Sequence, residues 1–300
     1  MHAHDHNRAG DRRALAIALA LILAFMVVEV AAGVLAGSVA LIADAGHMLT
    51  DVFALAAAIV AARLALRPAS GPWTFGLGRA EILAAQANGI ALLLVGGWIV
   101  ISSVRRLVSP TEVRGGIVLV VALIGVAVNL VATLVLSRAD RGNLNIRGAF
   151  LHVATDLAAF VGTAIAGGLI LLTGWNRLDP IAALLVAALM LHSSWVLLRE
   201  SGRIFLEASP AGIDPDAVSR VLAAEDDVVE VHDLHVWTVT SGFPALAAHV
   251  LVEPGVDCHD ARRRLQHVLE EQFGLRHTTL QVDHVARRAQ DVRLGALHRG

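Results

Sequence analysis

The sequence has no lysine, a single cysteine and few charged residues of either sign. Charged side chains make up 17% of the 300 residues, and the formal net charge is −2. The permanently cationic side chains are therefore all arginines, and no domain is strongly basic, so nothing in the composition calls for nucleic acid as a partner. The lone Cys258 has no second cysteine for an intramolecular disulfide, and it excludes a cysteine-rich zinc finger.

Hydrophobic residues, in contrast, are abundant. They form 56% of the chain, and the mean hydropathy is +0.66, a balance that a water-soluble globular protein could hardly keep in solution. Six apolar stretches each approach the ~20 residues needed to cross a hydrocarbon core roughly 30 Å thick. They predict a six-helix membrane domain over residues 14–205, after a tail of residues 1–13. The stretches are approximately 14–36, 39–66, 81–108, 115–137, 147–173 and 179–199.

The distribution of arginine predicts the orientation in the membrane, because short cytoplasmic loops carry an excess of positive charge. With the N-terminus inside, eleven arginines flank the stretches on the cytoplasmic side and four on the outer side. We therefore expect a multi-pass protein of the cell inner membrane with both termini in the cytoplasm. The inner set is Arg8, Arg12, Arg13, Arg63, Arg67, Arg79, Arg138, Arg141, Arg147, Arg199 and Arg203, and the outer set is Arg105, Arg106, Arg114 and Arg177.

Residues 206–290 predict a cytoplasmic α+β domain of order α-β-β-α-β, which is a ferredoxin-like arrangement, and residues 291–300 form a tail. Asp214 followed by Pro215 is a typical helix start. "VVEVHDLHVWTVT" and "FPALAAHVLVE" alternate like strands and are joined through Ser-Gly, which is typical of a hairpin. "DCHDARRRLQHVLEEQFG" predicts a helix that Gly274 ends, and "TTLQVDHV" a third strand.

Two of the apolar stretches carry matched polar pairs. In "ADAGHMLTDVFALAAAIVAA", His47 and Asp51 are four residues apart and therefore point to the same side of a helix. "HVATD" gives His152 and Asp156 the same spacing in the fifth stretch, and each pair ends in Thr-Asp. A repeated pair of this kind favours a shared function over two unrelated structural contacts.

The two pairs are expected to meet inside the membrane. At ~1.5 Å per residue they lie roughly 8–18 Å in from opposite faces, on helices that run antiparallel. Ionisable groups at that depth cost a few kcal/mol each unless an ion compensates them. Two imidazoles and two carboxylates make a tetrahedral ligand set that suits Zn²⁺. The alternative is structural hydrogen bonding between helices.

Other intramembrane polar residues have two interpretations. Asp44, one turn before His47, is either a carboxylate behind the metal ligands or on an ion path, or a residue that caps the helix or faces water. Glu29, Asn88 and Asn129 are more simply explained as hydrogen-bonding residues between helices.

Four motifs together resemble those of the cation diffusion facilitator family, and most closely its bacterial zinc/cadmium/cobalt efflux branch. They are "ADAGHMLTD", "TFGLGRAEILAA", "HVATDLAAFVG" and "VHDLHVW", and the resemblance covers nearly the whole chain. It implies a homodimeric antiporter, not an enzyme, that exports zinc in exchange for protons, with cadmium or cobalt as further substrates. It also implies that the transport site is His47, Asp51, His152 and Asp156.

The resemblance implies a second metal site in the cytoplasmic domain. Its ligands would be His232, His249, His277 and Asp283, with His259 as an addition; some family members have a histidine where Gln281 stands. The alternative is a set of ordinary surface histidines. A third histidine group lies at the N-terminus, where a tract that captures zinc loosely and a disordered polar tail are equally compatible with the composition. This group is His2, His4 and His6.

Coupling to protons follows from the ligand types. Metal binding needs neutral imidazole and ionised carboxylate, so metal loading expels protons and protonation expels metal. Two other functions remain as alternatives, a membrane-embedded zinc metalloenzyme and a metal sensor that does not transport. The enzyme is disfavoured because catalytic zinc normally keeps three protein ligands and an open position, and the sequence has no HExxH motif.

Overall fold

A computed structural model describes residues 23–137, 144–240 and 242–285, without the side chains of residues 135–155. The chain divides into two compact units, which are treated separately below. The first comprises Met1–Ala58 and Ala85–Leu198, and the second comprises Ile59–Ala84 and Arg199–Gly300.

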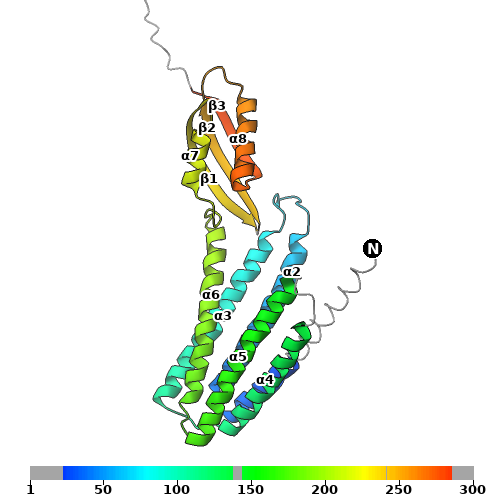
Figure 1. Ribbon diagram of the computed structural model, residues 1–300, viewed down its shortest axis with the longest axis vertical. Coiled ribbons are helices and arrows are strands. Elements are labelled where there is room, and N and C mark those ends of the chain that lie inside the picture. Colours follow the sequence, from blue (N-terminus) through cyan, green and yellow to red (C-terminus); the bar gives the residue numbers. More distant parts are fainter. Residues whose placement is uncertain (1–22, 138–143, 241, 286–300) are drawn as a thin grey trace, which may run out of the picture. The chain divides into compact units, whose positions relative to one another are not determined.

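The membrane-spanning helices form where the apolar stretches predict them. Among the described residues, five helices are long and apolar enough to cross a membrane, and a shorter apolar helix covers Leu23–Ala36. The prediction of a polytopic helical domain is confirmed, while residues 14–22 of the first predicted stretch lie outside the described part. The five long helices are α2 (Val39–Ala65), α3 (Arg79–Val108), α4 (Gly115–Ser137), α5 (Leu144–Thr173) and α6 (Leu178–Phe205) (Figure 1).

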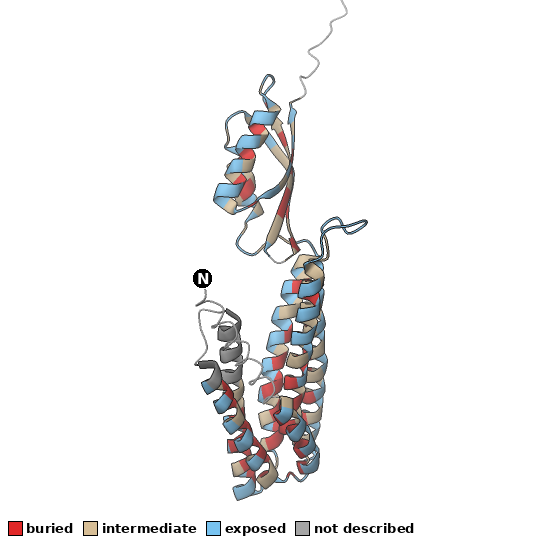
Figure 2. Ribbon diagram, turned by 90° about the vertical axis from the view of Figure 1, so that its right-hand side faces the viewer, coloured by how far each residue is buried: buried red, intermediate tan, exposed pale blue. Residues whose placement is uncertain are grey.

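The helices bury mainly small and aliphatic side chains between them, and many other large apolar side chains are exposed on the outside of the unit. One core cluster joins the Leu23–Ala36 helix, α2, α4 and α5, and includes Met48 and Phe160. A second joins α2, α3 and α6, and includes Met190. Outward-facing side chains such as Leu94 and Leu185 are each 67% exposed, and Figure 2 shows this exposed layer along the helices. Such a surface suits lipid as its solvent.

Glycines let α4 and α5 approach closely. A Cβ at Gly125 would lie 2.5 Å from the ring of Phe160, and one at Gly167 would lie 2.8 Å from the backbone nitrogen of Leu119. Small residues at such interfaces let backbones pack closely, which is how helices associate without a hydrophobic driving force. The α4–α5 interface therefore has no room for even one added methyl group at these positions.

The start of α2 is held by a carboxylate from another helix. Asp179, at the start of α6, accepts hydrogen bonds from the backbone N–H of Val39 (2.7 Å) and of Ala40 (3.4 Å) and from the Ser38 hydroxyl. The Ser38 hydroxyl in turn accepts from the N–H of Leu41 at 3.1 Å. The otherwise unsatisfied donors of the first turn of α2 are thus paired in a buried setting, as helix ends require.

The cytoplasmic domain has the predicted order of elements. Its sheet has the strand order β1-β2-β3, with β1 and β2 antiparallel and β2 and β3 parallel, and α8 provides the crossover that a parallel pair needs. Helices α7 and α8 pack against the sheet in one shared core, and Figure 1 shows these elements together in the C-terminal part of the chain. The elements are α7 (Pro215–Ala223), β1 (Val228–Thr240), β2 (Phe243–Val252), α8 (Cys258–Phe273) and β3 (His277–His284).

Local sequence signals explain the ends of these helices. The Asp214 carboxylate accepts from the N–H of Asp216, with Pro215 at the first position of α7, as predicted. Helix α8 ends at Gly274, whose φ of 68° is the left-handed conformation that favours glycine. The stripe of Ala261 and Leu265 faces the shared core.

Candidate metal centres

His47 and Asp51 are the two predicted ligands of the membrane site that lie on α2. They lie one helical turn apart on α2, with 3.7 Å between His47 Nδ1 and Asp51 Oδ2, and their side chains are 26% and 31% exposed. Thr50 does not add a ligand here, because its hydroxyl donates to the backbone carbonyl of His47 at 2.6 Å. The pair is therefore turned to one side of α2, as the spacing predicts.

The other two predicted ligands, His152 and Asp156, belong to α5. Asp156 is twelve residues after Leu144, where α5 begins, and Asp51 is twelve residues after Val39, where α2 begins. At ~1.5 Å per residue each carboxylate is therefore about 18 Å along its helix. The backbone of His152 lies one turn before Asp156 within α5, and its side chain is outside the described residues.

The helices that carry these predicted ligands share a buried core. Met48 of α2 and Phe160 of α5 belong to this core. The ligand atoms of His47, Asp51 and Asp156 do not all lie within 4.8 Å of one another.

Two further carboxyl groups lie deeper than the predicted ligands. Asp44 is 5% exposed and Glu29 is fully buried, and their helices pack directly against each other at Gly33 and Ile42. Asp156 is within electrostatic reach of both. Asp44 therefore neither faces water nor lies apart from the site. Glu29 was assigned a structural role from sequence, because no spacing rule relates it to residues on α2.

The cytoplasmic domain contains a compact group of metal-ligating side chains. Ligand atoms of His232, Asp233 and His249 lie within 4.8 Å of one another. His232 and His249 pair across β1 and β2 with ring centroids 5.4 Å apart, and Asp233 Oδ2 is 3.6 Å from His249 Nδ1. Two imidazoles and a carboxylate suit zinc and leave room for further ligands. Sequence reasoning included both histidines and missed Asp233.

A β-bulge explains why Asp233 was missed. Strict alternation places neighbouring residues on opposite faces of a strand, but the register of β1 shifts between His232 and His235, and Asp233 has φ 49°. Aspartate tolerates this left-handed conformation better than most residues. The bulge re-aims the carboxylate toward His249.

The other predicted ligands of this domain lie outside the group of His232, Asp233 and His249 among the described residues of this chain. His277 pairs in register with Ala245 and packs against the ring of Phe243, with centroids 5.1 Å apart, whereas Gln281 pairs with His249. Asp283 accepts a hydrogen bond from the Gln281 amide at 2.8 Å. The ligand role of these residues stays a prediction. His259 lies in the first turn of α8, and the predicted tract of His2, His4 and His6 lies outside the described residues.

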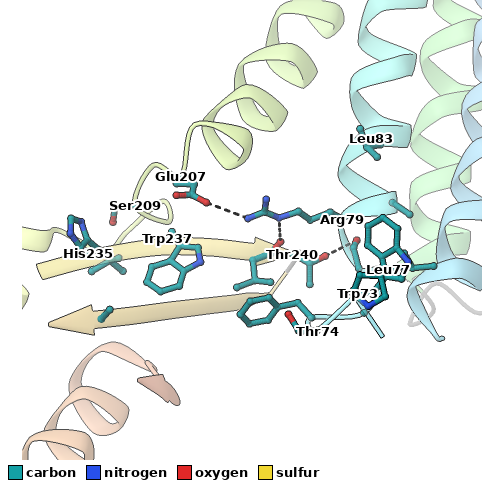
Figure 3. A pocket seen from close by; sticks show the side chains of 18 of the residues that line it. Trp73, Thr74, Leu77, Arg79, Leu83, Glu207, Ser209, His235, Trp237 and Thr240 are labelled. Carbon is teal, nitrogen blue, oxygen red and sulfur yellow. Dashed lines mark hydrogen bonds and ion pairs between the residues drawn. The ribbon is translucent and has the colours of Figure 1, made fainter. Parts of the chain in front are cut away.

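A cavity of about 1040 Å³ lies within the second unit, where the segment before α3, the end of α6 and strand β1 meet (Figure 3). Arg79 donates from Nε to the Val239 carbonyl at 3.1 Å and lies 3.7 Å from Glu207, while the Thr240 hydroxyl donates to the Gly78 carbonyl at 2.8 Å. The aromatic lining comes from Trp73, Phe75 and Trp237. These contacts tie the start of α3 to the end of β1, and no group of three metal-ligating side chains occurs among the described lining residues.

Comparisons with known proteins identify the family. The cation efflux transmembrane domain matches residues 15–206, and the cytoplasmic domain of cation efflux proteins matches residues 210–285. The chain belongs to the cation efflux family. This is a family of metal cation transporters rather than enzymes, and membership makes the chain a multi-pass membrane protein.

Relatives in the cation efflux family match along nearly their full length. The chain is 38% identical over 285 residues to the cadmium, cobalt and zinc/H(+)-K(+) antiporter of Bacillus subtilis strain 168, covering 93% of this chain and 91% of the relative. It is 38% identical over 291 residues to the zinc transporter ZitB of Escherichia coli strain K12, covering 94% and 92%. The solved metal-bound C-terminal domain of the CzcD transporter from Cupriavidus metallidurans is 31% identical, with a TM-score of 0.23, covering 23% of this chain and 97% of that one.

Proposed function

We propose that this protein exports Zn²⁺ from the cytoplasm in exchange for protons, through a site formed by His47, Asp51, His152 and Asp156. The observation that carries the proposal is that Asp51 and Asp156 each lie twelve residues from the start of their helix, on two helices that share a buried core. The similarity to named zinc, cadmium and cobalt transporters supports the same substrate class.

The ligand types favour zinc-like metals. Imidazole suits zinc and its neighbours, whereas magnesium and calcium prefer ligand sets made only of oxygen. Two carboxylates neutralise the two positive charges of the ion, so a loaded site adds no net charge to the membrane interior. Cadmium and cobalt fit the same donors and are the expected further substrates.

Proton exchange follows from the same donors. Protonation of an imidazole or a carboxylate removes a ligand, so one site binds metal and protons alternately. We expect metal to load from the cytoplasm and protons arriving from the other side to displace it. We also propose that the protein acts as a homodimer in the inner membrane, with both termini and the cytoplasmic domain inside. The match to the cytoplasmic domain of cation efflux proteins supports this assembly.

Zinc uptake into everted membrane vesicles tests the proposal. Wild type should take up zinc when a pH gradient is imposed, whereas Asp51→Asn and Asp156→Asn should lose uptake because each removes an anionic ligand. Ser103→Ala is the matched control, since Ser103 is fully buried on α3 and belongs to no predicted site. Uptake that ignores the gradient, or that survives both aspartate changes, contradicts the proposal.

A second measurement, zinc flux in proteoliposomes, distinguishes a transporter from the rival functions. A zinc metalloenzyme or a sensor that only signals through the cytoplasmic domain would bind metal without moving it. Zinc flux in proteoliposomes containing the purified protein as the sole component therefore separates a transporter from both alternatives.

A further inference from the structure

Glu29 and Asp44 form a buried carboxyl pair that the proposed metal site does not use. Glu29 comes from the Leu23–Ala36 helix and is 0% exposed, and Asp44 comes from α2 and is 5% exposed. Neither oxygen of Glu29, nor Oδ2 of Asp44, accepts a hydrogen bond from a donor in the described part of the chain. The helices that carry them pack directly against each other here, since a Cβ at Gly33, one turn after Glu29, would lie 3.0 Å from Cγ1 of Ile42, two residues before Asp44.

The charged groups around this pair are also acidic. The carboxylate of Asp156 on α5 is near enough to repel negative charge on both groups, and that of Asp51 on α2 is near enough to repel it on Asp44. His47 lies one turn after Asp44 on the same helix, and α2 carries no arginine before Arg63 in its last turn. Two facing carboxyl groups in a site sealed from water cannot both be ionised without a compensating cation. Uncompensated charge at this depth is also costly.

We propose that Glu29 and Asp44 bind one proton between them, as an ion-binding site separate from the metal ligands. When the proton is bound, one carboxylic acid donates a hydrogen bond to the other carboxylate. When it leaves to water, two carboxylates remain. The inference rests on the proposed function, because the pair then supplies one of the protons that are exchanged for metal.

Charge links this pair to the metal site. A divalent cation held by Asp51 and Asp156 places positive charge close to both carboxyl groups and stabilises their ionised form. Metal binding therefore favours release of the shared proton, and by linkage the bound proton weakens metal binding. The pair thereby adds a proton to the exchange without giving up a metal ligand.

If Glu29 only held the two helices together, Glu29→Gln would have a different effect from the one expected of a proton-binding residue. In Glu29→Gln, the side-chain amide still donates a hydrogen bond to the Asp44 carboxylate. The contact between the two helices survives, but the exchangeable proton is lost. Glu29→Gln therefore separates proton binding from structural hydrogen bonding, and Asp44→Asn tests the partner in the same way.

The first experiment measures protons released when zinc binds. Calorimetry of the full-length protein in detergent, repeated in buffers of different ionisation enthalpy, gives zinc affinity, stoichiometry and proton release together. In Glu29→Gln and Asp44→Asn we expect unchanged zinc stoichiometry and proton release that falls by about one per site. Ser103→Ala should match wild type in all three quantities.

Infrared spectroscopy provides a direct readout of the proton. Wild type without metal should show the C=O stretch of a protonated carboxylic acid at neutral pH, shifted in D₂O and lost on zinc binding. Both variants should lack this band. Unchanged proton release together with a retained band in Glu29→Gln overturns the inference, and so does a loss of zinc stoichiometry, which would make the pair a metal site.

Failure of this inference is distinguishable from failure of the proposed function. If wild type moves no zinc in proteoliposomes, the transport proposal fails, while calorimetry and infrared spectra still report on the carboxyl pair. If Asp156→Asn loses zinc binding while Glu29→Gln keeps wild-type proton release, the transport site stands and the carboxyl pair is only a contact between helices.

Discussion

Asp233 shows how one backbone angle decides what a side chain can bind. Its φ of 49° within the bulge of β1 turns the carboxylate toward His249 on the neighbouring strand. His232 and His249 were predictable, because paired strands and alternating patterns bring such residues together. The bulge was not predictable, because the motif "VHDLHVW" contains no glycine to mark it.

We predict that Asp233→Ala weakens zinc binding in the cytoplasmic domain about 10- to 100-fold, and that His249→Ala does so at least as strongly. The reason is that each change removes a donor from a group that spans only 4.8 Å. Equilibrium dialysis of full-length protein carrying Asp51→Asn isolates this site from the membrane site. His267→Ala, on the exposed side of α8, is the control histidine change. Equal zinc binding in Asp233→Ala and His267→Ala would falsify the assignment of Asp233.

The elements themselves were largely readable from the sequence. Long apolar runs define α2 to α6 within a few residues, since a span needs a minimum length of hydrocarbon-compatible side chains. The contacts between different helices could not be predicted from the sequence. Asp179 holds the start of α2 from 140 positions away, and Glu29 meets Asp44 from another helix. No periodicity relates residues on different helices.

Gly167 and Gly162 on α5 provide a matched test of helix packing. A Cβ at Gly167 would meet the backbone of α4 at 2.8 Å, whereas one at Gly162 would meet nothing within 4 Å. We expect Gly167→Ala to destabilise the protein by about 1–3 kcal/mol through overpacking. Gly162→Ala should be neutral, or stabilising by up to about 1 kcal/mol through helix propensity. Thermal unfolding in detergent measures both, and equal melting temperatures would refute the tight α4–α5 contact.

At the scale of the whole molecule, the sequence predicted two parts, and the structure contains a helical membrane unit and an α+β domain. The family match covers both parts. Their order along the chain was predictable because the composition changes abruptly near residue 205. The orientation in the membrane rests on arginine distribution alone and stays a prediction.

The single cysteine tests that orientation. Cys258 begins α8 in the cytoplasmic domain and is partly exposed. A membrane-impermeant maleimide should therefore label it in everted vesicles and not in intact cells. As a control, Ser109→Cys combined with Cys258→Ser places the thiol between α3 and α4, on the predicted outer side, and should reverse the pattern. Labelling of Cys258 in intact cells would place the domain outside.

Helix α2 contributes buried residues to both described clusters of the membrane unit, one shared with α4 and α5 and the other with α3 and α6. The contact between α3 and α6 is also close-packed, since a Cβ at Gly89 of α3 would lie 3.0 Å from Leu198 of α6. Two closely packed helix pairs, α4 with α5 and α3 with α6, therefore meet at α2, which carries His47 and Asp51. A movement of one pair relative to the other would therefore displace α2, and with it two of the predicted metal ligands.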